Sequence, residues 1–243
     1  MPLSYSEIIS NDIQICIWQI TEEEIFLSSG LSLSKEALER LSSRKSEVHR
    51  KGYLAIRQLL KSCGIAPETH QYDKQGVPYL TDGRYLSITH TKNMAAIAIS
   101  IFPVGIDLEY YQEKIKKIAV RFLHMEESKD HSKTDNIEFL SQIWTAKEAI
   151  YKAFRTPGIH FNTQLLVEPF QPRAASGVGH VLHQDKDWLY SLNFRYFKDY
   201  ATQGGINTTM IISGPNVNRK NEIHHGFTSL LDLAPTFYEV ADV

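Results

Sequence analysis

The sequence predicts an α+β protein composed of two halves of similar plan. Short runs in which apolar residues alternate with polar ones, typical of half-buried strands, occur in both halves of the 243-residue chain. Longer stretches with apolar residues at helical spacing follow the first strand of each half. The resulting order is strand, helices and hairpin, and then strand, helices and further strands. This order favours a sheet with its own helices in each half.

The first half is expected to contain a strand, a helical region and a hairpin, at residues 13–18, 34–64 and 85–101. Ser34 is the expected N-cap of the helical region, and Gly64 is its expected end. The serines at 42–43 interrupt the region, which predicts either two helices or one interrupted helix. Pro103 ends the hairpin, so we place the domain boundary there, with halves at 1–103 and 104–243.

The second half is expected to contain a strand, two helices and three later strands, at residues 104–109, 113–124, 137–155, 164–167, 188–197 and 206–213. Residues 156–158, Thr-Pro-Gly, end the second helix. The tail from about residue 214 has no regular pattern, and the sequence assigns it no function.

Composition excludes several classes of protein. The formal net charge is -2 and the isoelectric point is about 6.6, so the chain lacks the overall positive charge that favours nucleic-acid binding. Two cysteines in apolar contexts, Cys16 and Cys63, argue against a disulfide scaffold or a thiolate zinc site. No secretory leader pattern and no apolar run long enough to span a bilayer occur, so we expect a cytoplasmic protein without a membrane partner.

Asp107 and Glu109 lie two positions apart on a predicted strand, so both carboxylates should project from one face. At about 4 Å, their repulsion would be on the order of 4 kcal/mol at an effective dielectric constant near 20. A divalent cation would reverse that repulsion, and Mg²⁺ prefers such oxygen ligands. The alternative is that both acids point into solvent from an edge strand.

The predicted helix near residues 138–155 carries charged residues beside its apolar stripe. Trp144, Glu148, Lys152 and Arg155 share one flank at helical spacing, and Lys147 lies near its border. An exposed ion pair between Glu148 and Lys152 would explain the charges alone. The tryptophan favours a partly covered flank instead.

Residues 105–109, Gly-Ile-Asp-Leu-Glu, and 144–149, Trp-Thr-Ala-Lys-Glu-Ala, resemble the G-I-D-x-E and W-x-x-K-E-A motifs of the Sfp-type 4'-phosphopantetheinyl transferase family. Both occur in full, in the family's order and at its spacing. Residues 87–91 resemble its S-x-S-H-S/T element, and residues 54–60 resemble its L-A-x-R-x-L-L segment. The resemblance covers about residues 10–213.

The resemblance implies a magnesium-dependent enzyme that transfers the 4'-phosphopantetheine group of coenzyme A to a serine of an apo acyl or peptidyl carrier protein and releases 3',5'-ADP. It also implies two pseudo-symmetric halves that meet near Pro103, with the active site in the cleft between them. The length favours the family's two-half form, which is usually a monomer.

The resemblance also implies roles for individual residues. Asp107, Glu109 and Glu148 would hold Mg²⁺. Glu148 is also the candidate general base, directly or through a water, and Lys152 would stabilise or protonate the leaving group, so that Glu148, Lys152 and Asp107 form the predicted catalytic set. Trp144 is expected to pack the helix in place. The side chains expected to bind the coenzyme are Arg57, Lys74, His90, Thr91, Lys147 and Lys152.

One element departs from the family pattern. The family's G-K-P or G-R-P element carries a cation for the 3'-phosphate of the coenzyme, whereas residues 76–78 read Gly-Val-Pro here. Lys74 lies close enough in sequence to supply that charge if the loop curls.

Two other interpretations remain open from the sequence. A metal-dependent nuclease or phosphohydrolase also uses D-x-E carboxylates and lysines, although the acidic isoelectric point and the lack of a basic-aromatic stripe disfavour a nucleic-acid substrate. A non-catalytic protein that binds coenzyme A or a carrier would fit the substitution at Val77.

Overall fold

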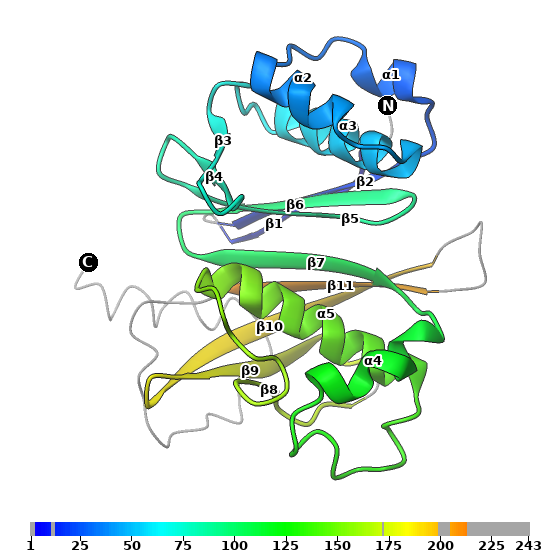
Figure 1. Ribbon diagram of the computed structural model, residues 1–243, viewed down its shortest axis with the longest axis vertical. Helices are drawn as coiled ribbons and strands as arrows, with labels where there is room; N and C mark the ends of the chain where they lie inside the picture. Colours follow the sequence, from blue (N-terminus) through cyan, green and yellow to red (C-terminus); the bar gives the residue numbers. More distant parts are fainter. Residues whose placement is uncertain (1–2, 11–12, 172, 199–204, 213–243) are drawn as a thin grey trace. The chain divides into compact units, whose positions relative to one another are not determined.

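The computed structural model describes residues 3–10, 13–171, 173–198 and 205–212, and divides the chain into two compact units, Met1–Ile101 and Phe102–Val243 (Figure 1). Each unit has its own antiparallel sheet and its own helices. The α+β class expected from the element order is therefore confirmed. The pseudo-symmetry of the halves stays a prediction.

Unit 1 contains a four-stranded antiparallel sheet in the order β1-β2-β6-β5. These strands span Leu3–Ser10, Ile13–Gln19, Met94–Ser100 and Tyr85–His90, respectively. The register of β2 against β6 runs from Ile13 opposite Ser100 to Gln19 opposite Met94. Every residue of β6 is buried, which explains its continuous apolar sequence.

Three helices, α1 (Glu24–Ser28), α2 (Lys35–Ser42) and α3 (Glu47–Ser62), accompany this sheet. The Ser34 hydroxyl accepts a hydrogen bond from the Ala37 amide, as expected of an N-cap. The long helix α3 packs on β2, β5 and β6, and its Leu54, Ile56 and Leu59 are almost completely buried. The hairpin β3 (His70–Tyr72) and β4 (Pro78–Leu80) completes the unit.

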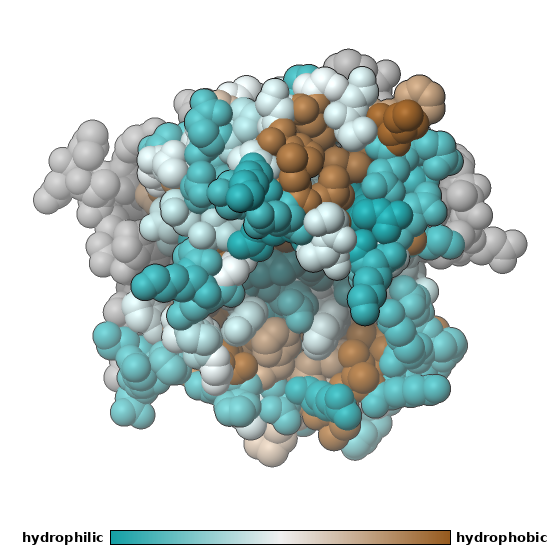
Figure 2. Space-filling view, turned by 45° about the horizontal axis from the view of Figure 1, so that its top comes forward, coloured by the Kyte–Doolittle hydropathy of each residue, from teal (hydrophilic) through white to brown (hydrophobic). Residues whose placement is uncertain are grey.

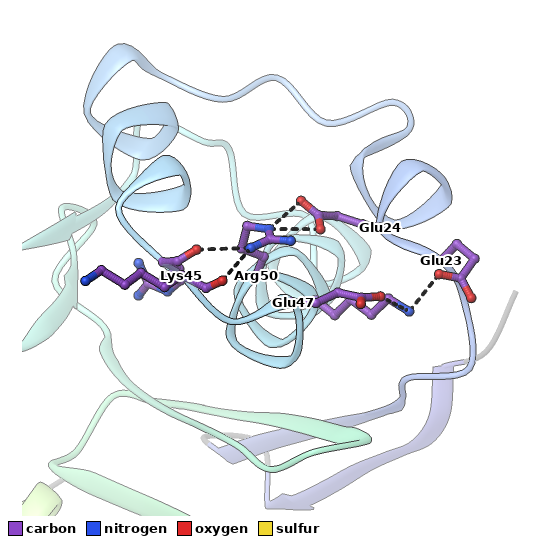
Figure 3. A network of polar contacts seen from close by, with 7 residues as sticks. Glu23, Glu24, Lys45, Glu47 and Arg50 are labelled. Carbon is purple, nitrogen blue, oxygen red and sulfur yellow. Dashed lines mark hydrogen bonds and ion pairs between the residues drawn. The ribbon is translucent and has the colours of Figure 1, made fainter.

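Polar contacts fix the N-terminal part of α3 (Figure 3). The Arg50 guanidinium binds the Glu24 carboxylate of α1 at 2.9 Å and donates to the backbone oxygens of Arg44 and Lys45. Lys51 pairs with Glu23 and Glu47. These bonds hold the short connection between α2 and α3 against the start of α3.

Unit 2 contains a five-stranded antiparallel sheet in the order β7-β11-β10-β9-β8. These strands span Val104–Tyr110, Gly205–Ile212, Lys186–Lys198, Ser176–His183 and Leu165–Val167, respectively. Helix α5 (Ile137–Phe154) packs on β7, β8, β9 and β11, and α4 (Lys114–Phe122) packs on α5. Asn136 caps the start of α5, and Arg155 ends it in the left-handed conformation.

The sequence missed several short or irregular elements. These are α1 and the strands β1, β3, β4 and β9. The expected strand at residues 206–213 is present as β11, and residue 213 and the tail from 214 lie outside the described residues.

The surface view shows apolar areas separated by hydrophilic side chains (Figure 2). Large apolar residues exposed in the described part of the chain include Phe26 on α1, Leu38 on α2 and Val120 on α4. Single exposed residues of this kind are ordinary. Cys16 and Cys63 are free thiols whose sulfur atoms lie 3.2 Å apart in unit 1. Among the described helices, none combines the length and the apolar character that crossing a bilayer requires.

Candidate active site

The first strand of unit 2 and its long helix touch through their backbones. A Cβ atom built on Gly105 of β7 would lie 1.9 Å from the carbonyl oxygen of Ala149 on α5. Only glycine permits this approach. The glycine of the first motif and the final alanine of the second are therefore direct neighbours, which brings both motifs to one place.

Asp107 follows Gly105 by two residues and also faces α5. Its side chain is buried, and its Oδ1 accepts a hydrogen bond from Lys152 Nζ at 2.7 Å. The same ammonium donates to the backbone oxygen of Ile106 at 3.1 Å. Lys152 thus holds one carboxylate oxygen of Asp107 in a charge-assisted bond.

Glu109 lies two residues further along the same face. Its Oε1 accepts a hydrogen bond from the Trp144 indole at 3.3 Å, so the common face expected for Asp107 and Glu109 is confirmed. The indole also packs against the rings of Phe122 and Phe161. Trp144 is consequently both a packing residue and a hydrogen-bond donor to one of the carboxylates of Asp107, Glu109 and Glu148, which we call the acidic cluster. Only its packing role was expected.

Glu148 lies one helical turn from both Trp144 and Lys152. Burial, and secondly the Asp107 carboxylate, raise the pKa of Glu148 to about 7, while Lys152 opposes that rise. Burial and then Asp107 also raise the pKa of Glu109. The three carboxylates therefore repel one another across a partly dry space.

The donor set has the chemistry that a hard divalent cation prefers, because three carboxylates with mutual repulsion occur beside one lysine. Within residues 3–10, 13–171, 173–198 and 205–212, however, no group of three or more His, Cys, Asp or Glu side chains is arranged to hold a metal ion. Lys152 and Trp144 each bind one of the carboxylates instead. The magnesium assignment to Asp107, Glu109 and Glu148 therefore stays a prediction, supported by charge and not by a formed ligand sphere.

Lys147 is a correction to the expected coenzyme-binding set. Its side chain is 0% exposed, and its Nζ lies within 3.0 Å of four oxygens. One of them belongs to Glu127, at 2.8 Å. Burial lowers the pKa of Lys147 to about 8 and raises the pKa of Glu127. A phosphate has no access to this ammonium, so the expectation that Lys147 binds coenzyme A is wrong.

The expected phosphate ligands of unit 1 occur around α3. Arg57 donates to the Tyr53 hydroxyl at 2.7 Å, and its guanidinium lies 3.6 Å from the Tyr53 ring centroid. Tyr72 of β3 lies within 3.5 Å of the same guanidinium. The Arg57 side chain is thus fixed by two aromatic residues.

Two further arginines, which the sequence did not single out, join this group. Arg40 of α2 lies over the Tyr72 ring, and Arg44 lies over the Tyr53 ring, each 4.3 Å from the centroid. The buried Nε2 of His70 has no hydrogen-bond partner in the described part of the chain. Burial, and then Arg57 and Arg40, lower the pKa of His70 to about 3. Arg40, Arg44 and Arg57 form a local positive cluster on a chain of slightly negative net charge.

His90 and Thr91 lie at the end of β5, as expected. The Thr91 amide donates to the Met94 oxygen at 2.7 Å and closes the turn. A Cβ atom on Gly52 of α3 would lie only 2.7 Å from His90 Nδ1. The glycine inside α3 therefore makes room for the His90 ring.

Lys74 lies in the turn between β3 and β4, and its side chain is exposed. Asp73 shapes this turn by accepting hydrogen bonds from the amides of Gln75 and Val77, each at 2.8 Å. The turn does curl, as the substitution hypothesis for Lys74 requires. Tyr72, beneath Arg40, pairs with Pro78 on the same hairpin, so Arg40 is a second source of charge near Val77.

Both motifs lie in unit 2, the first on β7 and the second on α5. The model of the 4'-phosphopantetheinyl transferase superfamily matches residues 103–203, so this segment of the chain is similar to that superfamily. The resemblance found in its motifs is confirmed.

Two curated relatives are similar to parts of the chain. The 4'-phosphopantetheinyl transferase gsp of Aneurinibacillus migulanus is 30% identical over 136 residues, which are 53% of this chain and 57% of that protein. The chain thus matches little more than half the length of this relative. An arylsulfatase of Klebsiella aerogenes is 44% identical over 48 residues, 20% of this chain and 10% of that protein. That match is too short to carry a functional argument.

Proposed function

We propose that this protein transfers the 4'-phosphopantetheine group of coenzyme A to a serine of an apo acyl or peptidyl carrier protein, with release of 3',5'-ADP. The observation that carries the proposal is the pairing of the two motifs across β7 and α5. Gly105 contacts Ala149, Asp107 binds Lys152, and Glu109 accepts from Trp144. Gly105 and Glu109 of the first motif thus contact Ala149 and Trp144 of the second, and Asp107 contacts Lys152, which follows the second motif on α5.

Glu148 is the proposed general base. In the reaction, the serine oxygen forms a bond to the β-phosphorus of coenzyme A, and the bond from that phosphorus to the bridging oxygen breaks. The serine proton passes to Glu148, whose pKa near 7 suits a group that exchanges protons at neutral pH. The released 3',5'-ADP leaves with the bridging oxygen.

Lys152 is proposed to neutralise the charge that develops on the leaving group. Its ammonium is half-buried and already bound to Asp107, so it is held in place before the substrate arrives. Asp107, Glu109 and Glu148 would bind Mg²⁺, which when bound would supply positive charge beside the pyrophosphate.

Arg57, Lys74, His90 and Thr91 of unit 1 are proposed to bind phosphates of the coenzyme, together with Arg40 and Arg44. The positive cluster supports this role, because its three guanidinium groups gather over the Tyr53 and Tyr72 rings, and guanidinium groups are well suited to bind phosphates. Arg40 and Lys74 are the proposed replacements for the cation absent at Val77. We propose that the protein works in the cytoplasm as a monomer, on carriers of fatty acid, polyketide or non-ribosomal peptide synthesis.

Incubation with apo carrier proteins, coenzyme A and Mg²⁺ tests the proposal. The expected result is the mass increment of phosphopantetheine on at least one of the three carrier types. Asp107→Ala should lower the rate by at least about 100-fold, because it removes a carboxylate that binds Lys152 and the metal. Hydrolysis of a phosphodiester without any carrier would favour a phosphohydrolase, and coenzyme A binding without transfer would favour a non-catalytic binding protein.

A further inference from the structure

Lys147 stands out because a completely buried lysine requires compensation for its charge. Its Nζ lies 2.6 Å from Phe122 O, 2.7 Å from Leu165 O and 3.0 Å from Phe161 O. The Glu127 carboxylate completes this set. One ammonium therefore joins α5 to the end of α4, to the loop before β8 and to β8 itself.

Glu127 has further partners that fix it in turn. Its Oε1 accepts from the Val167 amide at 2.8 Å, and its Oε2 accepts from the His124 amide at 2.7 Å. Both carboxylate oxygens are thus bound to backbone groups. The pair is a rigid connection between three segments of unit 2.

Residues 147–149 of α5 meet three different surroundings. Lys147 faces Glu127, Glu148 faces the carboxylates of β7, and Ala149 touches Gly105. Consecutive residues of a helix differ by about 100° in direction. Fixing residue 147 on one side and residue 149 on another leaves residue 148 one orientation.

We propose that the Lys147–Glu127 pair is a positioning device that sets the rotation of α5 and thereby holds Glu148 and Trp144 against β7. Its consequence for catalysis rests on the proposed transfer reaction. Its effect on the position of α5 is independent of that reaction, because Trp144 reports this position without any substrate. Lys147 is accordingly a positioning residue and has no contact with coenzyme A.

The first arm of the test uses fluorescence. In a Trp18→Phe/Trp188→Phe background, emission comes from Trp144 alone. Lys147→Met should shift that emission and increase its quenching by acrylamide, because the indole loses its fixed place beside Glu109. Leu192→Ala, which removes a fully buried side chain of β10 in the same core, is the matched control and should leave the Trp144 signal unchanged.

The second arm measures transfer kinetics with the otherwise native chain. Lys147→Met should lower kcat at least 10-fold and change the KM for coenzyme A less than 2-fold, because the base is misplaced while phosphate binding is intact. Glu127→Gln, which keeps the lysine, should change both readouts in the same direction by a smaller factor, and it provides the same comparison if Lys147→Met fails to fold.

Particular outcomes overturn the inference. A rise of 10-fold or more in the KM for coenzyme A at constant kcat would make Lys147 a ligand of the coenzyme. An unchanged Trp144 signal in both variants, or an equal change in Leu192→Ala, would show that the pair does not position α5. If the native protein transfers nothing, the proposed function fails, and the fluorescence arm still decides the positioning role.

Discussion

At the scale of single residues, Glu148 concentrates the electrostatics of the candidate site. Its carboxylate is half-buried and lies in the field of Asp107, so its pKa rises to about 7. Desolvation and a like charge both disfavour the ionised form. A cation bound among the carboxylates would act in the opposite direction. The protonation of Glu148 should therefore respond to both pH and Mg²⁺.

We expect kcat, at saturating coenzyme A and carrier and limiting Mg²⁺, to fall about tenfold per pH unit below the pKa of Glu148, which is about 7 without a bound cation. The sign follows because a raised pKa keeps the proton on Glu148 at higher pH, and only the ionised form accepts the serine proton. A higher Mg²⁺ concentration should move this acid limb, the fall in kcat with decreasing pH, to lower pH. Glu148→Gln should reduce kcat at least about 100-fold and show no such limb. A fall of the same slope and midpoint in Glu148→Gln would exclude Glu148 as the base.

Gly52 determines the place of His90. Gly52→Ala should favour α3 by about 0.5–1 kcal/mol in helix propensity, yet its methyl group would displace the His90 ring. If His90 binds a phosphate, the KM for coenzyme A should rise about 10-fold, since a hydrogen bond to a charged group contributes about 1.5–3 kcal/mol. The control is His90→Ala, in which Gly52→Ala should add no further increase. Additive effects would mean that Gly52 acts by another route.

At the scale of elements, the close contact of β7 and α5 depends on Gly105. Gly105→Ala would place a methyl group against a helix backbone oxygen and should destabilise the protein by about 3 kcal/mol or more, measured by urea unfolding. Gly177→Ala on β9 is the matched control, because its methyl would meet a carbon of the Phe194 ring at 3.2 Å, which can shift. We expect less than about 1 kcal/mol there. Equal losses would show that the contact has no special role.

The elements that the sequence predicted well have a clear apolar pattern, which is a continuous run in β6 and a helical stripe in α5. Strand β9 was missed because its segment Ser176–His183 contains two glycines and two histidines, so its alternation is weak, and its pairing with β10 is a long-range property. Strands β3 and β4 have three residues each, too few to show a period.

For the candidate site, the sequence predicted what depends on local spacing and missed the contacts that form only on folding. Spacing alone indicated that Asp107 and Glu109 share a face, because that face depends only on the strand period. It could not reveal what covers Lys147, since Glu127 lies in a polar segment between the two predicted helices. Arg40 and Arg44 were missed for the same reason, because their contacts with Tyr72 and Tyr53 form only in the folded unit.

At the scale of the whole molecule, the proposed function divides its groups between the two units. The positive cluster and His90 belong to unit 1, and the carboxylates belong to unit 2. A single site that uses both sets must show thermodynamic coupling, because the cation and the coenzyme would share the pyrophosphate. Coupling of this kind is reciprocal, so each ligand must tighten the other by the same factor.

Calorimetry on the full chain measures that coupling. Mg²⁺ should tighten coenzyme A binding about 5- to 150-fold, the usual range of such effects. Asp107→Asn should remove the coupling, because it removes a carboxylate proposed to hold the cation and leaves the arginines of unit 1 in place. Arg57→Ala should weaken coenzyme A binding with and without Mg²⁺ by the same factor, because a lost phosphate contact does not depend on the cation. If Mg²⁺ leaves coenzyme A affinity unchanged in the native protein, the carboxylates of unit 2 and the arginines of unit 1 do not serve one bound coenzyme.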